Sequence, residues 1–369
     1  MKIKHIMCTF FSLMAIVGLM GCKDNNNNEN NNITEKNSSV SDTGTNIVSS
    51  APNNGKIQSC TKELFAMDTY MTVTAYGDNA ETAVSESLKE IQRLDALLST
   101  GSDSSEITLL NNSGSAVLSE DSRYLFEKAD SIYKSTNGAY DITVFPLMRL
   151  WGFQGDDPSL PTETDIKKTL ELVGMDRVKY DNGKITLGSG QSVDFGGIAK
   201  GYTGDRIMKI FEEYDIISGV ISLGGNVQCY KIKTDGSLWR CGITDPNDPS
   251  GMIGKVEVAD KAVITSGGYE RFFTDEKTGK TYHHIMDPST GYSADNGLIS
   301  VTIVSRDGTL ADGLSTACFV LGEEKAVEFW KQHSSEFDMI LVTDNNRIIV
   351  TEGIGDCFSS EHDFEVVEK

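Results

Sequence analysis

The second half of the sequence is dominated by short segments rich in valine, isoleucine, leucine and threonine, and these restrict the fold more than any other feature. Glycine, asparagine and aspartate separate many of them, which is typical of strands joined by tight turns. The predicted strands are 184–187, 220–223, 228–233, 238–243, 254–258, 262–265, 299–304, 339–343 and 347–351. Because their connections are mostly short, we expect them to pair as hairpins in an antiparallel sheet.

The first half of the sequence carries most of the predicted helices. Residues 81–98 and 120–135 place apolar side chains at helical spacing, and residues 164–173 and 200–214 are predicted helices as well. Residues 69–76 alternate as a strand does. Helices that cluster early and strands that dominate later indicate an α+β fold, mostly antiparallel sheet with packed helices.

The N-terminus is predicted to export and anchor the protein. Residues 1–21 join two early lysines to a short apolar run, as a secretory signal peptide does. Residues 19–22 (LMGC) resemble the lipobox of bacterial lipoproteins, in which Cys22 becomes the lipidated first residue; the alternative is an ordinary signal peptide with an incidental cysteine. Residues 22–58, rich in asparagine and serine, would form a disordered tether, and residues 59–369 the folded domain. A lipid at Cys22 would hold this domain to the outer face of a bacterial cell membrane.

Charge and residue spacing argue against nucleic-acid binding and against a transition-metal hydrolase. A net charge of −21 repels phosphate backbones, so no nucleic acid is expected, and a small or cationic partner is favoured. No group of histidine, cysteine and carboxylate residues has zinc-ligand spacing, which disfavours a transition-metal hydrolase.

Cys229 and Cys241 form a possible disulfide. The segment between them is predicted to be a hairpin whose three-residue loop, 234–236, pairs Lys233 with Ser237 and so sets the two cysteines opposite each other. An exported protein can keep a disulfide there. A two-residue loop would shift the register by one and separate the cysteines, and buried, unpaired cysteines are the other alternative.

Two segments could carry chemistry at a turn. Residues 194–201 (DFGGIAKG) lead into a predicted helix, and their glycines, free N–H groups and Lys200 could cradle a phosphate; a simple tight turn is the alternative. His283 and His284 precede a predicted tight loop, where a general base or a ligand-orienting group could sit. A structural role is the alternative for either histidine.

Residues 311–322 (ADGLSTACFVLG) begin with a polar face and continue as an apolar helix. Asp312 and Thr316 lie four residues apart, so both oxygens can face one ion, and oxygen ligands suit magnesium or calcium. The alternative is that Asp312 caps the helix and Thr316 bonds back to a carbonyl.

Eight segments occur in a recognisable order. They are 67–69 (MDT), 104–107 (SSEI), 137–144 (NGAYDITV), 194–202 (DFGGIAKGY), 223–226 (LGGN), 265–271 (TSGGYER), 284–288 (HIMDP) and 311–317 (ADGLSTA). Together they resemble the ApbE family, the bacterial FAD:protein FMN transferases, with a T-fold-like domain. Residues 59–369 would then be a flavin transferase catalytic domain.

This resemblance implies Mg²⁺-dependent transfer of FMN from FAD to a threonine or serine hydroxyl of a redox protein, through a phosphoester bond, with release of AMP. It implies that Asp312, Thr316 and the backbone oxygen of Gly197 hold the metal, and that His284 handles the proton of the nucleophile. The FAD contacts that it implies are Met67, Ala139, Tyr140, Asp141, Asp194, Lys200 and Ile285. The expected acceptor is a Rnf/Nqr-type or other flavinylated electron-transport subunit. The enzyme would act on it at the periplasmic side of the inner membrane or at the outer surface of the cell.

Two residues depart from the usual pattern of the family, and two other functions are alternatives to flavin transfer. Phe145 stands where the family usually has glycine, which would narrow the flavin pocket, and Gly313 replaces the common alanine, which would loosen the helix start. The alternatives are a Mg²⁺-dependent FAD pyrophosphatase, with water as the acceptor, and a lipid-anchored protein that binds flavin without chemistry.

Overall fold

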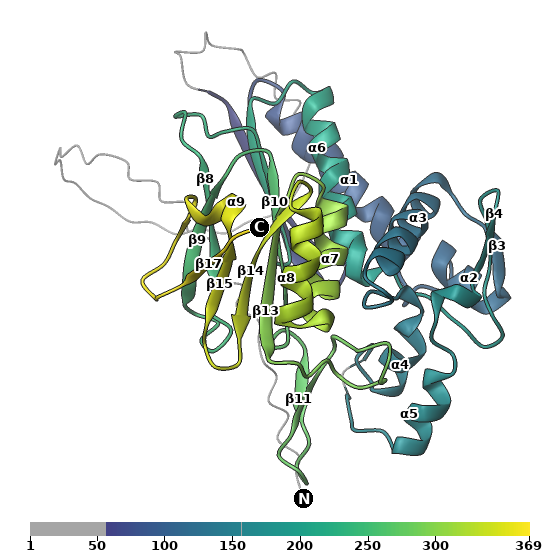
Figure 1. The fold of residues 1–369 in the computed structure, drawn as a ribbon. Helices are drawn as coiled ribbons and strands as arrows, with labels where there is room; N and C mark the ends of the chain where they lie inside the picture. The colour runs from purple at the N-terminus through teal and green to yellow at the C-terminus, as the bar shows by residue number, and fades with distance from the viewer. Residues whose placement is uncertain (1–56, 156) are drawn as a thin grey trace, which may run out of the picture.

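A nine-stranded sheet forms the centre of the fold (Figure 1). The computed structural model describes residues 57–155 and 157–369, so the predicted signal peptide, Cys22 and most of the tether lie outside the described residues. In sheet order, the strands are β1 (Ser59–Ala66), β2 (Thr69–Tyr76), β6 (Ser218–Leu223), β7 (Asn226–Tyr230), β10 (Lys261–Gly267), β13 (Leu298–Ser305), β14 (Phe337–Thr343), β15 (Ile348–Thr351) and β17 (Glu365–Val367). All neighbours are antiparallel except β15 and β17. The predicted α+β class with mostly antiparallel sheet is therefore confirmed.

Helices cover one face of this sheet and a smaller sheet covers part of the other (Figure 1). The helices are α1 (Ala80–Leu98), α6 (Gly196–Glu213), α7 (Gly308–Leu321) and α8 (Glu323–His333), and the smaller sheet has the order β16 (Phe358–Ser359), β9 (Met252–Val258), β8 (Trp239–Thr244). In β14, Met339 and Leu341 join the helical core while Ile340 and Val342 pack toward β8 and β9. Burial on both faces explains why residues 339–342 of β14 form a continuous apolar run.

Most of the remaining elements lie beside the helical layer, whereas residues 352–355 pack against β14, β15 and β17 on the side of the smaller sheet. The remaining elements are α2 (Glu106–Ser113), α3 (Glu120–Ser135), α4 (Phe145–Leu150), α5 (Glu163–Leu170), α9 (Glu352–Gly355), the 3-10 turns η1 (Ile142–Val144) and η2 (Met175–Arg177), the sheet β3 (Ser115–Val117), β5 (Lys184–Thr186), β4 (Lys179–Asp181), and the two-stranded sheet β11 (Phe272–Thr274), β12 (Thr281–His283). The hairpin of β11 and β12 projects at the bottom of the view in Figure 1.

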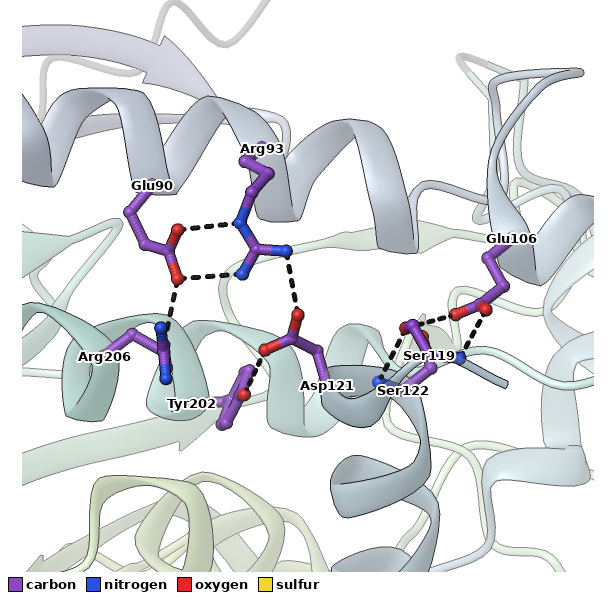
Figure 2. A network of polar contacts seen from close by, with 8 residues as sticks. All are labelled: Glu90, Arg93, Glu106, Ser119, Asp121, Ser122, Tyr202 and Arg206. Atoms are coloured by element: carbon purple, nitrogen blue, oxygen red, sulfur yellow. Dashed lines mark hydrogen bonds and ion pairs between the residues drawn. The ribbon is translucent and has the colours of Figure 1, made fainter. Parts of the chain in front are cut away.

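A network of ion pairs ties α6 to α1 and α3 (Figure 2). Arg93 of α1 donates to Glu90 on its own helix and to Asp121 of α3, at 2.8 Å each. Arg206 of α6 donates to the same Glu90 at 2.9 Å, and Tyr202 of α6 donates to Asp121. Because Glu90 and Asp121 are largely shielded from water, these bonds are screened less than surface pairs and hold α6 in a defined position.

The predicted helix at 200–214 is four residues too short at its start. Helix α6 begins at Gly196, so Gly196 and Gly197 of the 194–201 segment lie in its first turn. Glycine has a low helix propensity, which is why the sequence pattern favours a turn there. The first turn of the helix therefore coincides with the segment predicted to cradle a phosphate.

The predicted hairpin joining 228–233 to 238–243 is wrong as a pair of hydrogen-bonded strands. Its turn does form, with the Lys233 amide donating to the Ser237 carbonyl at 2.9 Å. Strand β7, however, pairs with β6 and β10, whereas β8 pairs with β9 in the other sheet. The apolar side chains of β8 bury themselves against the face of the large sheet, and that packing separates the two strands.

The two cysteines nevertheless meet across this sheet-to-sheet interface. The sulfurs of Cys229 and Cys241 lie 3.7 Å apart and both residues are buried. We predict a disulfide under oxidising conditions, which would join β7 to β8 and raise the free energy of unfolding by about 2–3 kcal/mol. Alkylation after denaturation without reductant, followed by mass spectrometry, should leave both thiols unlabelled, while the equally buried Cys318 is labelled. Equal labelling of all three would contradict the disulfide.

Candidate active site

Helices α6 and α7 touch at a glycine, and this contact builds the centre of the site. A Cβ atom placed on Gly201 of α6 would lie 2.1 Å from the carbonyl oxygen of Gly308 and 2.7 Å from the Cβ of Asp312, both on α7. The Gly201 amide donates to Asp312 Oδ2 at 2.8 Å. In a regular α-helix the Gly201 amide would donate to the Gly197 carbonyl. Because this amide donates to Asp312 instead, the Gly197 oxygen keeps a lone pair for another partner.

Asp312 is a buried carboxylate inside helix α7. The helix is capped by Asp307, whose carboxylate accepts from the Leu310 amide at 2.8 Å, so the alternative in which Asp312 is the cap is wrong. Besides Gly201, Asn226 donates to Asp312 at 3.0 Å. Burial raises the pKa of Asp312, with the charge of Lys200 opposing that shift. Within 57–155 and 157–369, no cation lies within ion-pair distance of it, and its ionised form is stabilised by these two hydrogen bonds and by the charge of Lys200.

The hydroxyl groups of Thr316, Ser266 and Tyr140 lie close to Gly197 or to one another at this helix contact. Thr316 Oγ1 is 3.3 Å from Ser266 Oγ, and a Cβ atom on Gly197 would lie 3.8 Å from Thr316 Oγ1 and 3.4 Å from the Tyr140 hydroxyl. That hydroxyl is buried and has no hydrogen-bond partner among the described residues. Gly197, Asp312 and Thr316 thus offer a carbonyl, a carboxylate and a hydroxyl, a set that fits Mg²⁺. Clusters of three or more histidine, cysteine or carboxylate ligands do not occur in the described ranges.

The two neighbouring histidines have different surroundings. His283 is held by the chain itself, since its Nε2 lies 3.0 Å from the Ala294 carbonyl and its Nδ1 accepts from the Ile285 amide. His284 has a buried Nδ1 with no hydrogen-bond partner in the part of the chain that the structure describes. Burial, and then the charge of Arg271, lowers the pKa of His284 to about 3. His284 is therefore a neutral ring whose Nδ1 is available to a ligand.

Charged groups from three segments converge on the same place. Burial raises the pKa of Asp194, whose carboxylate accepts from Gly196 at 2.7 Å and from Gln154 at 3.1 Å. Burial also raises the pKa of Glu270, and the charges of Lys200 and Arg271 oppose it. Glu270 and Arg271 belong to the 265–271 segment, one of the eight ordered motifs. The sequence predicted no role for either residue.

The other residues predicted to contact the flavin are spread over several segments, and one of them needs a qualification. Met67 has a left-handed backbone (φ 49°), and its sulfur lies 3.8 Å from the Thr203 hydroxyl of α6. Ile285 follows His284 and is buried, as are Ala139 and Tyr140. The Asp141 carboxylate is already engaged by Thr143 and by the Met175 amide. A flavin contact at Asp141 would therefore come from its backbone.

The two departures from the family pattern have structural explanations. Phe145 is buried as the first residue of α4, with Arg149 over its ring. Gly313 lies in the second turn of α7, so the expected effect on the helix start is wrong. A Cβ atom there would lie 2.5 Å from Ile132 Cδ1, which shows that Gly313 lets α3 pack closely against α7.

Comparison with known proteins gives one family. The ApbE family model matches residues 67–341. The chain is 34% identical over 282 residues to the FAD:protein FMN transferase of Klebsiella pneumoniae (73% of this chain, 85% of that protein), and 30% identical over 334 residues to that of Treponema pallidum (84% and 91%). Its fold is similar to the crystal structure of the ApbE protein of Thermotoga maritima, with a TM-score of 0.76, 31% identity, and coverage of 81% of this chain and 99% of that one.

Proposed function

The chain belongs to the ApbE family and is a FAD:protein FMN transferase, and we propose that it joins FMN from FAD to a threonine or serine hydroxyl of its acceptor with the help of Mg²⁺. The hydroxyl oxygen forms a bond to the FMN phosphorus while the bond from that phosphorus to the bridging oxygen breaks. AMP leaves with the bridging oxygen, and the hydroxyl proton is given up to a base. Because the phosphorus keeps its oxidation state, no redox partner is needed.

The buried Asp312 carboxylate, which has no ion-pair partner among the described residues, is the observation that carries this proposal. We assign the metal to Asp312, Thr316 and the Gly197 carbonyl, with phosphate oxygens of FAD and water as the remaining ligands. Bound there, Mg²⁺ would stabilise the negative charge that builds up as the P–O–P bond breaks. The rigid packing of α6 on α7 keeps these oxygens in place before FAD arrives.

His284 is our candidate for receiving the hydroxyl proton. Its Nδ1 has no partner among the described residues, and its ring is neutral, so it can accept a proton. Lys200 and Asp194 would orient the substrate beside it, as would the backbone of the 139–141 segment.

The low pKa of His284 predicts an unusual pH profile. Because burial and Arg271 hold it at about 3, His284 does not change charge near pH 6.5 in the free enzyme. We expect kcat/KM for FAD to show no acid limb from this residue between about pH 5 and pH 8. His284→Gln should lower activity by about 100-fold or more and leave the shape of the profile unchanged. An apparent pKa between 6 and 7 that disappears in His284→Gln would contradict the prediction.

The anchor and the acceptor complete the proposal. The LMGC sequence at 19–22 supports lipidation of Cys22 after removal of a signal peptide, which would place the enzyme on the extracytoplasmic face of a bacterial membrane. Across residues 57–155 and 157–369, none of the helices has the length and apolarity needed to span a bilayer. The acceptor would be a Rnf/Nqr-type or similar electron-transport subunit exposed on that side.

Incubation of the purified protein with FAD, Mg²⁺ and such a subunit tests the function. Flavin fluorescence that stays on the acceptor band after denaturing electrophoresis, with one AMP released per flavin attached, is the expected result. AMP without labelled acceptor would indicate a FAD pyrophosphatase instead. If neither product forms, the protein would be a flavin-binding protein without catalytic activity.

A further inference from the structure

Arg271 lies directly opposite His284 on the hairpin that borders the site. Strands β11 and β12 pair Phe272 with His283, and the His284 amide donates to the Arg271 carbonyl at 3.0 Å, which extends the ladder by one pair. Side chains opposite each other in an antiparallel ladder share a face. Arg271 therefore points to the same side as His284. Phe272 and His283 point to the other side, where they line a separate cavity of about 560 Å³.

The surroundings of Arg271 agree with this placement. Its positive charge acts on His284, Asp194 and Glu270, which come from three different segments of the chain. Its side chain is exposed and, among the described residues, makes no ion pair. By contrast, Arg93, Arg206, Arg240 and Arg347 each bind a carboxylate. The guanidinium of Arg271 thus keeps its donors free at the edge of the site.

We propose that Arg271 binds the pyrophosphate of FAD, a role that rests on the proposed flavin transfer. A guanidinium offers two parallel N–H donors that match two phosphate oxygens, and charge-assisted bonds of this kind are strong. Lys200 contributes a second positive charge from α6, so the pyrophosphate would lie between the hairpin and the helix. The same contact would place the phosphorus beside His284, the cross-strand neighbour of Arg271.

Phosphate binding at Arg271 would also change His284. In the free protein, burial and then the positive charge of Arg271 disfavour a proton on the imidazole. A phosphate anion paired with Arg271 would offset the contribution of Arg271, so His284 would be a stronger base with FAD bound than without it. The pair would therefore link substrate binding to proton removal.

Binding of FAD and of riboflavin, which lacks phosphate, separates this role from a structural one. We expect Arg271→Gln to weaken FAD binding by about 10- to 100-fold and riboflavin binding by less than about twofold. Arg271→Lys should recover part of the loss, because lysine restores the positive charge but not the two parallel N–H donors. Arg240→Gln, which removes an exposed arginine paired with Glu257 on β8, is the matched control and should change neither affinity. As a second probe, inorganic pyrophosphate should raise the melting temperature of the wild type but not of Arg271→Gln.

Unchanged FAD affinity in Arg271→Gln, or an equal loss for both flavins, would overturn the assignment. The outcome is separate from that of the proposed function. If the wild type labels its acceptor while FAD binding does not depend on Arg271, only the Arg271 inference fails. If FAD binding depends on Arg271 but no flavin is transferred, the inference stands and the transfer fails.

Discussion

Asp312→Asn is expected to reduce flavin transfer by about 1,000-fold or more while the protein stays folded. The substitution keeps the shape of the side chain but removes the only carboxylate among the three proposed metal ligands. The remaining hydroxyl and carbonyl are neutral and would hold Mg²⁺ poorly.

The stability of this variant provides a readout that does not depend on turnover. Burial raises the folded-state pKa of Asp312 above its unfolded value, so the metal-free wild type gains stability as the pH falls through the folded pKa. At neutral pH the ionised carboxylate therefore costs stability. We expect the melting temperature of metal-free Asp312→Asn to equal or exceed that of the wild type, although one of the bonds from Gly201 and Asn226 is lost. With FAD present, Mg²⁺ should raise the melting temperature of the wild type by roughly 2–5 °C and that of the variant not at all.

Asp338→Asn is the matched control for this experiment. Asp338 is also a buried carboxylate with a raised pKa, but it lies on β14 and bonds to Thr351. Its variant should keep both the activity and the response to Mg²⁺. Asp312→Asn that keeps a tenth of wild-type activity, or that responds to Mg²⁺ as the wild type does, would refute the metal assignment.

Gly201→Ala is expected to lower the free energy of unfolding by about 3 kcal/mol or more. The new methyl group would lie 2.1 Å from the Gly308 carbonyl oxygen, and that backbone atom cannot rotate away. Helices α6 and α7 would have to separate, which would also break the bond from the Gly201 amide to Asp312. The gain in helix propensity from alanine, about 1 kcal/mol, does not offset this strain.

Gly313→Ala serves as the comparison, because it adds the same methyl group to α7. Its Cβ atom would meet the end of the Ile132 side chain, which can change rotamer. Urea unfolding should therefore place Gly313→Ala about 2 kcal/mol above Gly201→Ala in stability. Equal midpoints for the two variants would show that the crossing of α6 and α7 tolerates a Cβ atom.

The hydrophobic pattern was sufficient for most of the secondary structure. The strand at 69–76 and the helix at 120–135 have the predicted bounds, because their patterns depend only on residues within a few positions of one another along the chain. The start of α6 was missed because Gly196 and Gly197 favour a turn locally. The pairing of β7 with β8 was wrong because the turn between them does not decide which sheet each strand joins.

The sequence by itself determined the family of the protein and the fold class and predicted the residues of the candidate site, since these follow from ordered motifs and local periodicity. Only the tertiary structure decided how those residues act together. It brought the Gly201 amide to Asp312, left Tyr140 and His284 without partners among the described residues, and set Arg271 opposite His284. Each of these contacts joins segments whose relation is set by packing and strand register, and no local spacing along the chain encodes that register.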